Sequence, residues 1–415
     1  MKIAIIGTGI SGLGAAYLLQ GRHDITLYEP NSYIGGHSRT IEVANGRSTV
    51  PVDTGFIVFN HRNYPHLTGL FRHLGVETVP SNMSFGASVA NGWLEYGSMG
   101  MFAQKENFLR PQFWGMLRDI LRFNRNALSF IAGKPEMTLR ECMDRMKMGD
   151  WFRRYYLQAM GAAIWSCSVE TILDYPAATF LRFFENHGLL TVGQQPQWHT
   201  VKGGSREYIA KITAGFRDKI RLSCAATVVS RTGEGAIVTD SQGGKEYFDQ
   251  VIFACHADMA LRLLDQADEA EREILGAFAY QKNTVVVHND ESFMPRHRKC
   301  WSSWVYLTEG ARDDSPVVSL SYWMNNLQGL KTDRPLIVTL NPGRLPAQDL
   351  ILDTHEFDHP VFTIAAINAQ RRIPEIQDRG GIWHCGAYQR YGFHEDGLMS
   401  AVAVAEKLGA TVPWL

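Results

Sequence analysis

Near the start of the 415-residue chain, a glycine-rich turn joins an apolar strand to a helix. The run Ile3–Ile6 is continuously apolar, as in a strand buried in a parallel sheet, and Gly7-x-Gly9-x-x-Gly12 follows it at once. The first glycine permits a tight turn, the second lets the backbone approach a pyrophosphate, and the third lets helix and strand pack closely. Glu29 follows about 20 residues later, at the end of the next expected strand, where a carboxylate can accept hydrogen bonds from ribose hydroxyls. The spacing therefore predicts a Rossmann-like dinucleotide-binding unit.

The composition is that of a folded chain large enough for about two or three domains. Hydrophobic residues make up 45% of it, too many for a disordered chain, and 41 basic against 42 acidic residues leave no overall positive field for nucleic acid. No apolar run approaches the roughly 18 residues of a membrane-spanning helix, and the first residues lack the pattern of a signal peptide. The cysteines form no C-x-x-C pair, so we expect no disulfide, no metal site and a reduced, cytoplasmic protein. They are Cys142, Cys167, Cys224, Cys255, Cys300 and Cys385.

Other elements are indicated by turn residues and by hydrophobic periodicity. Asn45-Gly46 between Thr40–Val43 and Val50–Asp53 predicts a hairpin. Pro111–Ile131 has the apolar spacing of a long helix with proline at its first position. Further helices are predicted over 13–19, 151–167 and 398–408, and further strands over 25–28, 226–229, 236–239, 248–254, 284–288, 304–307, 317–323, 336–340 and 381–386.

Several short motifs far apart in the chain accompany the fingerprint. They are Gly35-Gly36-His37-Ser38-Arg39-Thr40, Asp53-Thr54-Gly55-Phe56, Lys202-Gly203-Gly204-Ser205, Cys385-Gly386-Ala387 and Glu395-Asp396-Gly397-Leu398. Together they resemble the flavin-dependent amine oxidase superfamily, which includes protoporphyrinogen oxidase and phytoene desaturase. The resemblance implies FAD as cofactor, held by Gly7, Gly9, Ile10, Ser11, Gly12, Glu29, Gly35, Gly36, Arg39, Gly55, Phe56, Ala226, Gly386, Asp396, Gly397 and Leu398.

The chain departs from the family at two of these positions. His37 stands where the family has arginine in its Gly-Gly-Arg segment, and Arg39 lies two residues later. Ala226 falls where the family's backbone contact to adenine lies, although valine is more usual there.

The same resemblance implies an α/β fold with a discontinuous, Rossmann-like FAD-binding domain and a mixed α+β substrate domain. The FAD-binding domain is expected from residues 1–80, 201–265 and 376–415. The substrate domain combines a helical part, 81–200, which faces substrate or membrane, with an antiparallel sheet, 266–375.

The chain has one dinucleotide fingerprint and no second unit for NAD(P). This favours an oxidase or desaturase that takes electrons from an organic substrate and passes them to oxygen, a quinone or another carrier. Amine oxidases of the superfamily have a lysine just ahead of an apolar strand, and matching Val285–His288 to that strand puts Thr284 at the lysine position, with Lys282 two residues earlier. Amine oxidation is therefore disfavoured. An amine or protoporphyrinogen-type oxidase remains the alternative enzyme. The alternative without enzyme activity is a fold relative that has lost its cofactor and binds lipidated protein.

Longer phrases resemble one bacterial subfamily, the flavoprotein desaturases of furan fatty acid synthesis. They lie at 54–64, 285–295, 301–306, 321–327 and 339–342. The resemblance implies desaturation of a methyl-branched acyl chain of a membrane phospholipid by hydride transfer to flavin N5, and a functional link to an acyl-chain methyltransferase. A narrow apolar channel would hold the chain, and aromatic and methionine side chains of 81–200 could line it.

In such a reaction a positioned group takes a proton from the carbon beside the one that loses hydride. The candidates are Tyr322, Tyr306, His394 and His61, and the sequence does not choose among them.

The segment Arg110–Lys134 mixes apolar residues with Arg118, Arg122 and Arg125, and Arg153 and Arg154 extend its charge. A basic amphipathic helix of this kind can lie at an anionic membrane surface. We therefore expect a peripheral protein on the cytoplasmic face of the inner membrane, with a homodimer as a further possibility.

Overall fold

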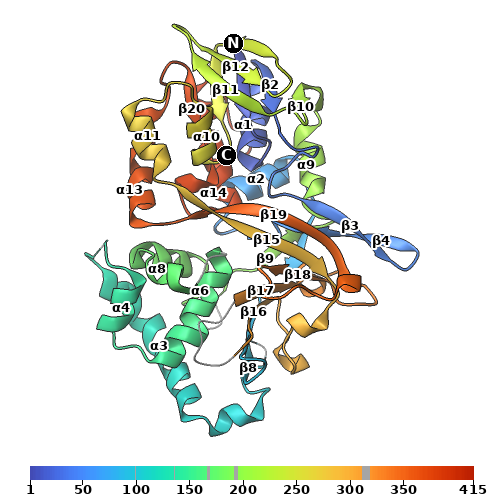
Figure 1. Cartoon of the computed structure of the whole chain (residues 1–415), viewed down its shortest axis with the longest axis vertical. Coiled ribbons are helices and arrows are strands. Elements are labelled where there is room, and N and C mark those ends of the chain that lie inside the picture. Colours follow the sequence, from blue (N-terminus) through green and yellow to red (C-terminus); the bar gives the residue numbers. More distant parts are fainter. Residues whose placement is uncertain (99, 135, 166–168, 191–194, 311–317) are drawn as a thin grey trace.

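The computed structural model describes residues 1–98, 100–134, 136–165, 169–190, 195–310 and 318–415, so Cys167 lies outside the described residues. Figure 1 shows two halves along the long axis. A parallel sheet with its helices forms the upper half, and a mainly antiparallel sheet, with one parallel pair of strands, forms the lower half together with a group of helices. The molecule is therefore an α/β fold that contains both kinds of sheet.

The upper half is built on a five-stranded sheet in the order β10 (Ile220–Arg221), β2 (Asp24–Tyr28), β1 (Lys2–Ile6), β14 (Gln250–Phe253) and β20 (Ile382–His384). All of its strands are parallel, with Ile3 opposite both Ile25 and Gln250. Three stretches that are distant in the sequence thus complete one sheet.

Both faces of this sheet are covered, which explains why β1 is apolar throughout. Ile3 and Ile5 join the core beneath α1 (Ile10–Leu19), α9 (Arg206–Thr213) and α14 (His394–Lys407). Ala4 and Ile6 face the opposite core, which includes residues of α10 (Ala257–Leu263), α11 (Glu269–Gly276) and α13 (Ile364–Arg372). Alternate side chains of a strand point to opposite faces, so a strand covered on both sides needs no polar alternation.

Smaller sheets flank the main one. The predicted hairpin is confirmed as β3 (Thr40–Asn45) and β4 (Ser48–Asp53), with Gly46 in the left-handed region at φ +62°. A three-stranded sheet consists of β11 (Ala226–Arg231), β12 (Ala236–Asp240) and β13 (Lys245–Phe248). Another consists of β5 (Phe59–Asn60), β9 (Trp198–Val201) and β6 (Thr78–Ser81).

The lower half contains a seven-stranded sheet in the order β19 (Ile351–Val361), β15 (Ala279–His288), β18 (Ile337–Leu340), β17 (Val318–Trp323), β16 (Trp304–Thr308), β7 (Phe85–Val89) and β8 (Leu94–Gly97). Its first two strands form a long ribbon that crosses between the halves (Figure 1). The hairpin β7–β8 lies within the stretch predicted as helical. Its turn has Asn91 and Gly92 at φ +55° and +84°, the Asn-Gly signal of a tight hairpin.

The helices of the lower half confirm the predicted long helix as α3 (Pro111–Ile131). The predicted helix 151–167 is divided into α5 (Asp150–Phe152), a π-helical turn (Arg153–Leu157) and α6 (Gln158–Trp165). The lower half also contains α4 (Leu139–Arg145), α7 (Val169–Leu173), α8 (Ala177–Asn186) and α12 (Met324–Leu327), whereas α2 (Pro65–His73) packs in the core of the upper half.

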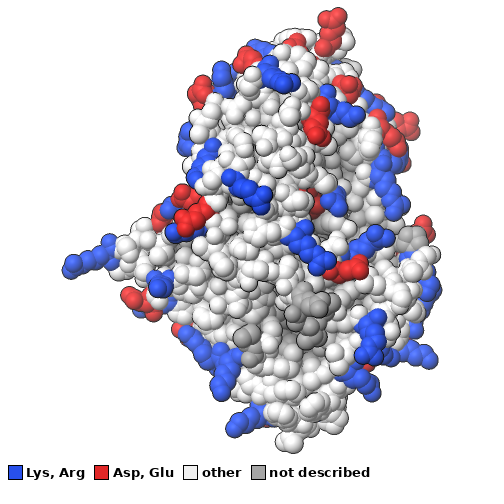
Figure 2. Space-filling view, turned by 180° about the vertical axis from the view of Figure 1, so that it is seen from behind, with Lys and Arg blue, Asp and Glu red and all other residues white. Residues whose placement is uncertain are grey.

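The surface differs between the two ends. Figure 2 shows Lys and Arg intermixed with Asp and Glu over the upper half, whereas the lower end is white at its tip and bordered mainly by Lys and Arg. Within the described ranges, none of the helices combines the length and the apolar character needed to cross a membrane.

Candidate functional site

The glycine fingerprint leaves room beside the first turn of α1. Gly9 is the N-cap of this helix, which has no side-chain cap and no acidic residue in its first turn. A Cβ on Gly9 would meet no neighbouring atom within 4 Å, whereas a Cβ on Gly12 would lie 2.0 Å from the carbonyl oxygen of Gly7. Uncapped amides, the positive end of the helix dipole and the open space at Gly9 together fit a pyrophosphate.

Glu29 is buried at the carboxyl end of β2 in a fixed orientation. Its Oε2 accepts hydrogen bonds from the amide and hydroxyl of Thr8, at 3.1 and 2.5 Å. Its Oε1 accepts from the amide and the side chain of Asn31, at 2.9 and 2.8 Å. These four donors match the about four acceptor positions of a carboxylate and hold Glu29 in place, so its contact with a ribose hydroxyl stays a prediction.

The second predicted loop lies directly on the fingerprint. Gly35 and Gly36 have φ of +128° and +57°, and a Cβ on Gly36 would lie 3.1 Å from the Cα of Gly9. A Cβ on Gly55 would lie 2.2 Å from the carbonyl oxygen of His37, so the two glycine loops are in close contact. The donor set and the shape of this corner therefore fit FAD.

Arg39 points away from this corner. Its Nη1 and Nη2 donate to the two carboxylate oxygens of Asp353 at 2.7 and 3.2 Å, and Nη1 also contacts the hydroxyl of Thr54 at 3.3 Å. The side chain ties its loop to β19, and its contact with the cofactor stays a prediction.

The motif Glu395-Asp396-Gly397-Leu398, at the start of α14, lies against the glycine fingerprint. A Cβ on Gly397 would lie 2.8 Å from the hydroxyl of Ser11 and 3.0 Å from Ile10. Leu398 packs against Gly14 of α1, and the amide of Gly386 donates to the hydroxyl of Ser400 at 2.9 Å. The N-termini of α1 and α14 thus lie side by side.

Asp396 and Ala226 occupy less central positions. The Asp396 carboxylate accepts from the amides of Phe393 and Tyr391 at 3.0 and 3.2 Å, and burial raises its pKa to about 6. Ala226 begins β11, beyond the bridge between Glu29 and Cys224. Both stay predicted cofactor contacts.

A cluster of histidines lies against the glycine loops, and the sequence analysis did not identify it. The ring of His37 stacks on Phe357 at 4.6 Å and lies 5.2 Å from His359 and 6.3 Å from His256. The Nε2 of His37 is buried without a hydrogen-bond partner among the described residues. Burial lowers the pKa of His37, and lowers that of His359 to about 4, so these imidazoles are neutral at pH 7. The alternation of His355, Phe357 and His359 along one strand was the available signal.

The four candidate proton acceptors lie in three places. His394 stacks on Phe56 at 3.8 Å, and its Nε2 lies 2.8 Å from Ser38 Oγ and 3.2 Å from Tyr208 Oη. Burial lowers its pKa to about 3. Tyr306 and Tyr322 belong to β16 and β17 and join the core shared with the helices of the lower half. His61 is exposed beside His199, at a ring distance of 4.2 Å. His394 is thus the candidate that contacts both glycine loops, through Ser38 and Phe56.

Asp53, which opens the Asp-x-Gly-Phe segment, is engaged within the protein. Its carboxylate accepts from the hydroxyl of Thr40 at 2.6 Å, the amide and hydroxyl of Ser205 at 2.9 and 2.8 Å, and the amide group of Gln328 at 3.0 Å. Burial raises its pKa to about 6 despite these donors. Asp53 therefore connects β4, α9 and the loop after α12.

The position expected for a catalytic lysine is occupied by Thr284 in β15. Its amide donates to Asn341 Oδ1 at 3.0 Å. The side chain of Lys282 is exposed.

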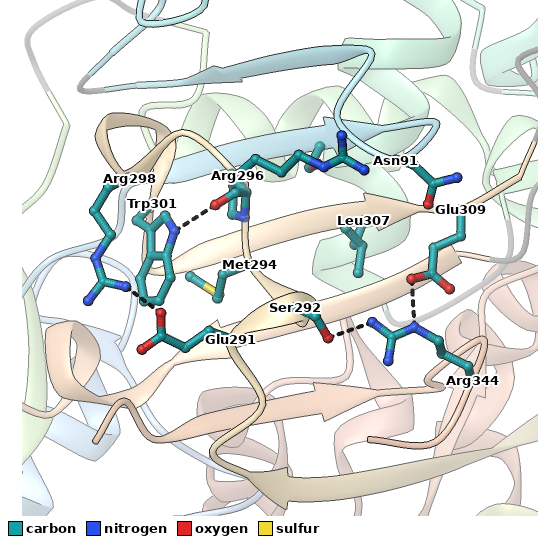
Figure 3. A pocket seen from close by; sticks show the side chains of 12 residues that line it. Asn91, Glu291, Ser292, Met294, Arg296, Arg298, Trp301, Leu307, Glu309 and Arg344 are labelled. Carbon is teal, nitrogen blue, oxygen red and sulfur yellow. Dashed lines mark hydrogen bonds and ion pairs between the residues drawn. The ribbon is translucent and has the colours of Figure 1, made fainter. Parts of the chain in front are cut away.

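A cavity of about 370 Å³ lies elsewhere, at the edge of the seven-stranded sheet (Figure 3). Its arginines are largely paired with its own walls, since Arg298 contacts Glu291 at 2.9 Å and Arg344 contacts Glu309 at 2.8 Å. It contains none of the predicted cofactor residues.

Comparison with known proteins places the chain among flavoproteins. The family described as flavin containing amine oxidoreductase matches residues 10–343. A protein assigned as a flavin-containing monoamine oxidase, AofH of Mycobacterium tuberculosis (strain ATCC 25618 / H37Rv), is 26% identical over 262 residues. The match covers 59% of this chain and 55% of that relative, so it spans little more than half of the relative's length.

Two solved structures extend the likeness in fold to the whole chain. Cyclohexylamine oxidase from Brevibacterium oxydans IH-35A has a TM-score of 0.69 at 16% identity, covering 98% of this chain and 99% of that one. A CLA-producing fatty acid isomerase from P. acnes has a TM-score of 0.67 at 14% identity, covering 98% of each chain.

Proposed function

The chain belongs to the flavin-containing amine oxidoreductase family, with FAD as its cofactor, and from this premise we propose that it desaturates a methyl-branched acyl chain of a membrane phospholipid. In the proposed reaction, part of furan fatty acid biosynthesis, one carbon of the chain loses a hydride, its neighbour loses a proton, and a double bond forms between them. FAD, when bound, supplies the hydride acceptor. The electrons then leave to oxygen, a quinone or another carrier.

The observation that carries the proposal is the group of neutral histidines that lie against the two glycine loops. His37, His359 and His394 are neutral because burial lowers the pKa of each. The nearby carboxylates of Asp53 and Asp396 are already occupied by protein donors. Among these side chains a substrate ammonium would therefore meet only carboxylates that already accept hydrogen bonds from the protein, whereas an aliphatic chain requires no such partner.

Thr284 also favours a hydrocarbon over an amine. A threonine hydroxyl cannot replace the lysine that amine oxidases of the superfamily have at this point, and Lys282 is exposed. The solved fatty acid isomerase shares the fold over 98% of both chains, so this architecture is compatible with a fatty acid substrate.

We propose His394 as the proton acceptor among the four candidates. If Nε2–H donates to Ser38 Oγ, at 2.8 Å, the lone pair of Nδ1 is available for the substrate proton. A carbon next to one that is losing hydride is strongly acidic in the transition state, so even an imidazole whose pKa is lowered to about 3 is basic enough.

The proposed partners follow from the proposed substrate. They are a phospholipid-borne acyl chain, a methyltransferase that supplies the methyl branch, and the cytoplasmic face of the inner membrane as a peripheral site. A homodimer is the proposed assembly.

The test is an anaerobic visible spectrum of the purified holoprotein before and after addition of phospholipid with methyl-branched, monounsaturated chains in detergent. We expect the oxidised-flavin band to bleach and a diene to be recovered from the lipid. Straight-chain monounsaturated phospholipid is the matched control and should leave the band unchanged over the same time.

A yellow protein that stays yellow with the branched lipid would refute the proposed substrate. Bleaching by a soluble amine or a porphyrinogen instead would establish the alternative oxidase. A colourless protein that binds lipid but cannot be reconstituted with FAD would overturn the enzyme assignment itself.

A further inference from the structure

The end of the molecule opposite the fingerprint carries an exposed apolar tip, formed by the turn before α3 and the start of that helix (Figure 1). Leu109 is 85% exposed, and three other large apolar side chains of the same region are about half exposed or more. They are Phe108 at 52%, Trp114 at 49% and Leu121 at 59%. Such contiguous apolar exposure in a folded protein marks a contact surface.

The tip has a fixed shape. Phe102 stacks on Phe108 with ring centroids 4.3 Å apart, and Trp114 lies 5.3 Å from Phe102. The indole Nε1 of Trp114 donates to the carbonyl oxygen of Phe108 at 3.1 Å. The buried side chain of Asn107 donates to the carbonyl oxygen of Glu95 at 2.9 Å and anchors the turn to β8. The tip can therefore enter an apolar medium without leaving its indole N–H unpaired.

Positive charge surrounds the tip. Residues 101–134 contain six basic side chains and two acidic ones. One of the two, Asp119, is buried and accepts from the amide of Gly149 at 2.9 Å. Figure 2 shows the corresponding white end bordered by Lys and Arg.

The arginines of α3 divide into two sets. Arg118 and Arg125 lie on the same stripe as Trp114 and Leu121, at spacings of four, three and four residues. Arg122 is about 40% exposed and is held by the protein, with Nη2 donating to the carbonyl oxygen of Lys147 at 2.8 Å. Arg118 and Arg125 are therefore the two arginines of the predicted patch that share a stripe with the exposed apolar side chains, and Arg122 lies beside that stripe.

We infer that the apolar tip inserts into the interface of an anionic lipid bilayer, with Arg118 and Arg125 at the level of the lipid phosphates. Aromatic and leucine side chains suit the boundary between headgroups and acyl chains, and arginine stems can lie along apolar surface while their charges reach phosphate. A surface of one charge sign around an apolar centre complements an anionic membrane. The inference deepens the proposed function and rests on it for the identity of the lipid to be processed.

The experiment measures co-sedimentation of the holoprotein with vesicles of phosphatidylglycerol and phosphatidylcholine, and with phosphatidylcholine alone. The double variant Leu109→Asp/Leu121→Asp should bind the mixed vesicles at least tenfold more weakly, because both exposed leucines become anionic. The control Leu345→Asp/Leu352→Asp changes two leucines away from the tip, one in the loop before β19 and one in β19 itself, which are 67% and 41% exposed. This variant should bind the vesicles as the wild type does. Arg118→Gln/Arg125→Gln should lose about tenfold at 0.15 M salt and little at 1 M.

Wild-type protein that stays in the supernatant with anionic vesicles would overturn the inference, as would equal binding of wild type and the Leu109→Asp/Leu121→Asp variant. Equal binding to phosphatidylcholine alone would overturn its electrostatic part. If light scattering shows that the wild type is a dimer and that the Leu109→Asp/Leu121→Asp variant is a monomer, the tip is a surface for self-association instead. Reduction of the flavin is measured separately, with detergent-solubilised lipid. Vesicle binding without flavin reduction would reject only the proposed function. Flavin reduction without vesicle binding would reject only the inserted tip.

Discussion

At Gly9 and Gly12 the same substitution has different consequences, because the two missing side chains face different neighbours. A methyl group on Gly12 would overlap the carbonyl oxygen of Gly7, whereas a methyl group on Gly9 would project into space that the protein leaves open. Gly9 also has φ −68°, which alanine adopts readily. Gly12 is therefore required by packing, and Gly9 by the approach of a ligand.

We therefore expect Gly9→Ala to fold with an unchanged melting temperature in the absence of FAD, and to bind FAD at least tenfold more weakly. Gly12→Ala should already lower the melting temperature of the FAD-free protein, because helix and strand must separate. Thermal unfolding with and without FAD measures both effects. Gly21→Ala is the control, since a Cβ there also meets nothing within 4 Å but lies past the end of α1. A Gly9→Ala protein with wild-type FAD affinity would contradict this assignment.

His394→Gln should slow anaerobic flavin reduction by about a hundredfold or more, while the flavin band of the purified protein is retained. The loss of a proton acceptor affects the rate, whereas the fingerprint still holds the cofactor. Stopped-flow absorbance measures the rate. If Tyr322→Phe produced that loss and His394→Gln did not, the proton acceptor would lie on β17 instead.

Individual contacts were the least predictable part of the site. The fingerprint, Glu29 and the two glycine loops could be identified because each is a short run of residues at a fixed spacing, and few other folds require that spacing. The ion pair of Arg39 with Asp353 joins residues 314 positions apart, and no local pattern encodes it. The histidine cluster likewise combines positions 37, 256 and 359, which only the folded chain brings together.

At the scale of elements, Asp53 is the point where three parts of the fold are joined. The strand β3, the N-terminus of α9 and the loop after α12 all donate to this carboxylate, which stands at the end of β4. Truncating it leaves several buried donors without an acceptor, and each costs about 1–3 kcal/mol.

Asp53→Ala should therefore lower the free energy of unfolding by about 3 kcal/mol or more, measured by urea denaturation of the FAD-free protein. Asp349→Ala, in a short exposed 3-10 turn, is the matched control and should change it by less than about 0.5 kcal/mol. Equal stability of the two variants would mean that the three elements are held together by packing alone.

Elements with their own start and stop signals were predicted well, and those that depend on distant partners were not. Pro111 fixed the start of α3, and Asn45-Gly46 fixed the first hairpin. The hairpin β7–β8 was missed although it has its own Asn91-Gly92 turn, because aromatic and methionine residues suggested helix and the partner strand β16 lies more than 200 residues away. Tertiary pairing here outweighed local composition.

For the molecule as a whole, buried ionisable groups set how stability depends on pH. Ten histidines of the described chain have a pKa lowered by burial, and they are His37, His66, His187, His199, His256, His288, His355, His359, His384 and His394. Below pH 6.5 the unfolded chain binds protons at these positions and the folded chain does not, so acid favours unfolding. Asp53, Glu395 and Asp396 act in the opposite sense, since burial raises their pKa to about 6, 7 and 6 and the folded state then binds more protons as the pH falls. The histidines are more numerous, so the net effect is loss of stability.

We expect the free energy of unfolding to decrease steadily from pH 7 to pH 5, as measured by urea denaturation in steps of pH. His384→Phe should reduce the slope of the free energy of unfolding against pH by the equivalent of up to one proton. The reason is that His384 has a pKa of about 3 and that neither of its ring nitrogens has a hydrogen-bond partner among the described residues. His73→Gln, at the exposed end of α2, serves as its control. A wild-type protein more stable at pH 5 than at pH 7 would show that the carboxyl groups dominate.

The parallel sheet that holds the fingerprint also has a consequence for biosynthesis. Its first two strands and α1 are synthesised more than 350 residues before β20 and α14, which close the corner at Gly397. At typical rates of translation the interval is on the order of tens of seconds. During that time the apolar side of α1 that Leu398 will cover has no partner from α14. The middle segments of the nascent chain are the ones that can shelter this face until the sheet is complete, and FAD can be fully enclosed only after α14 has been synthesised.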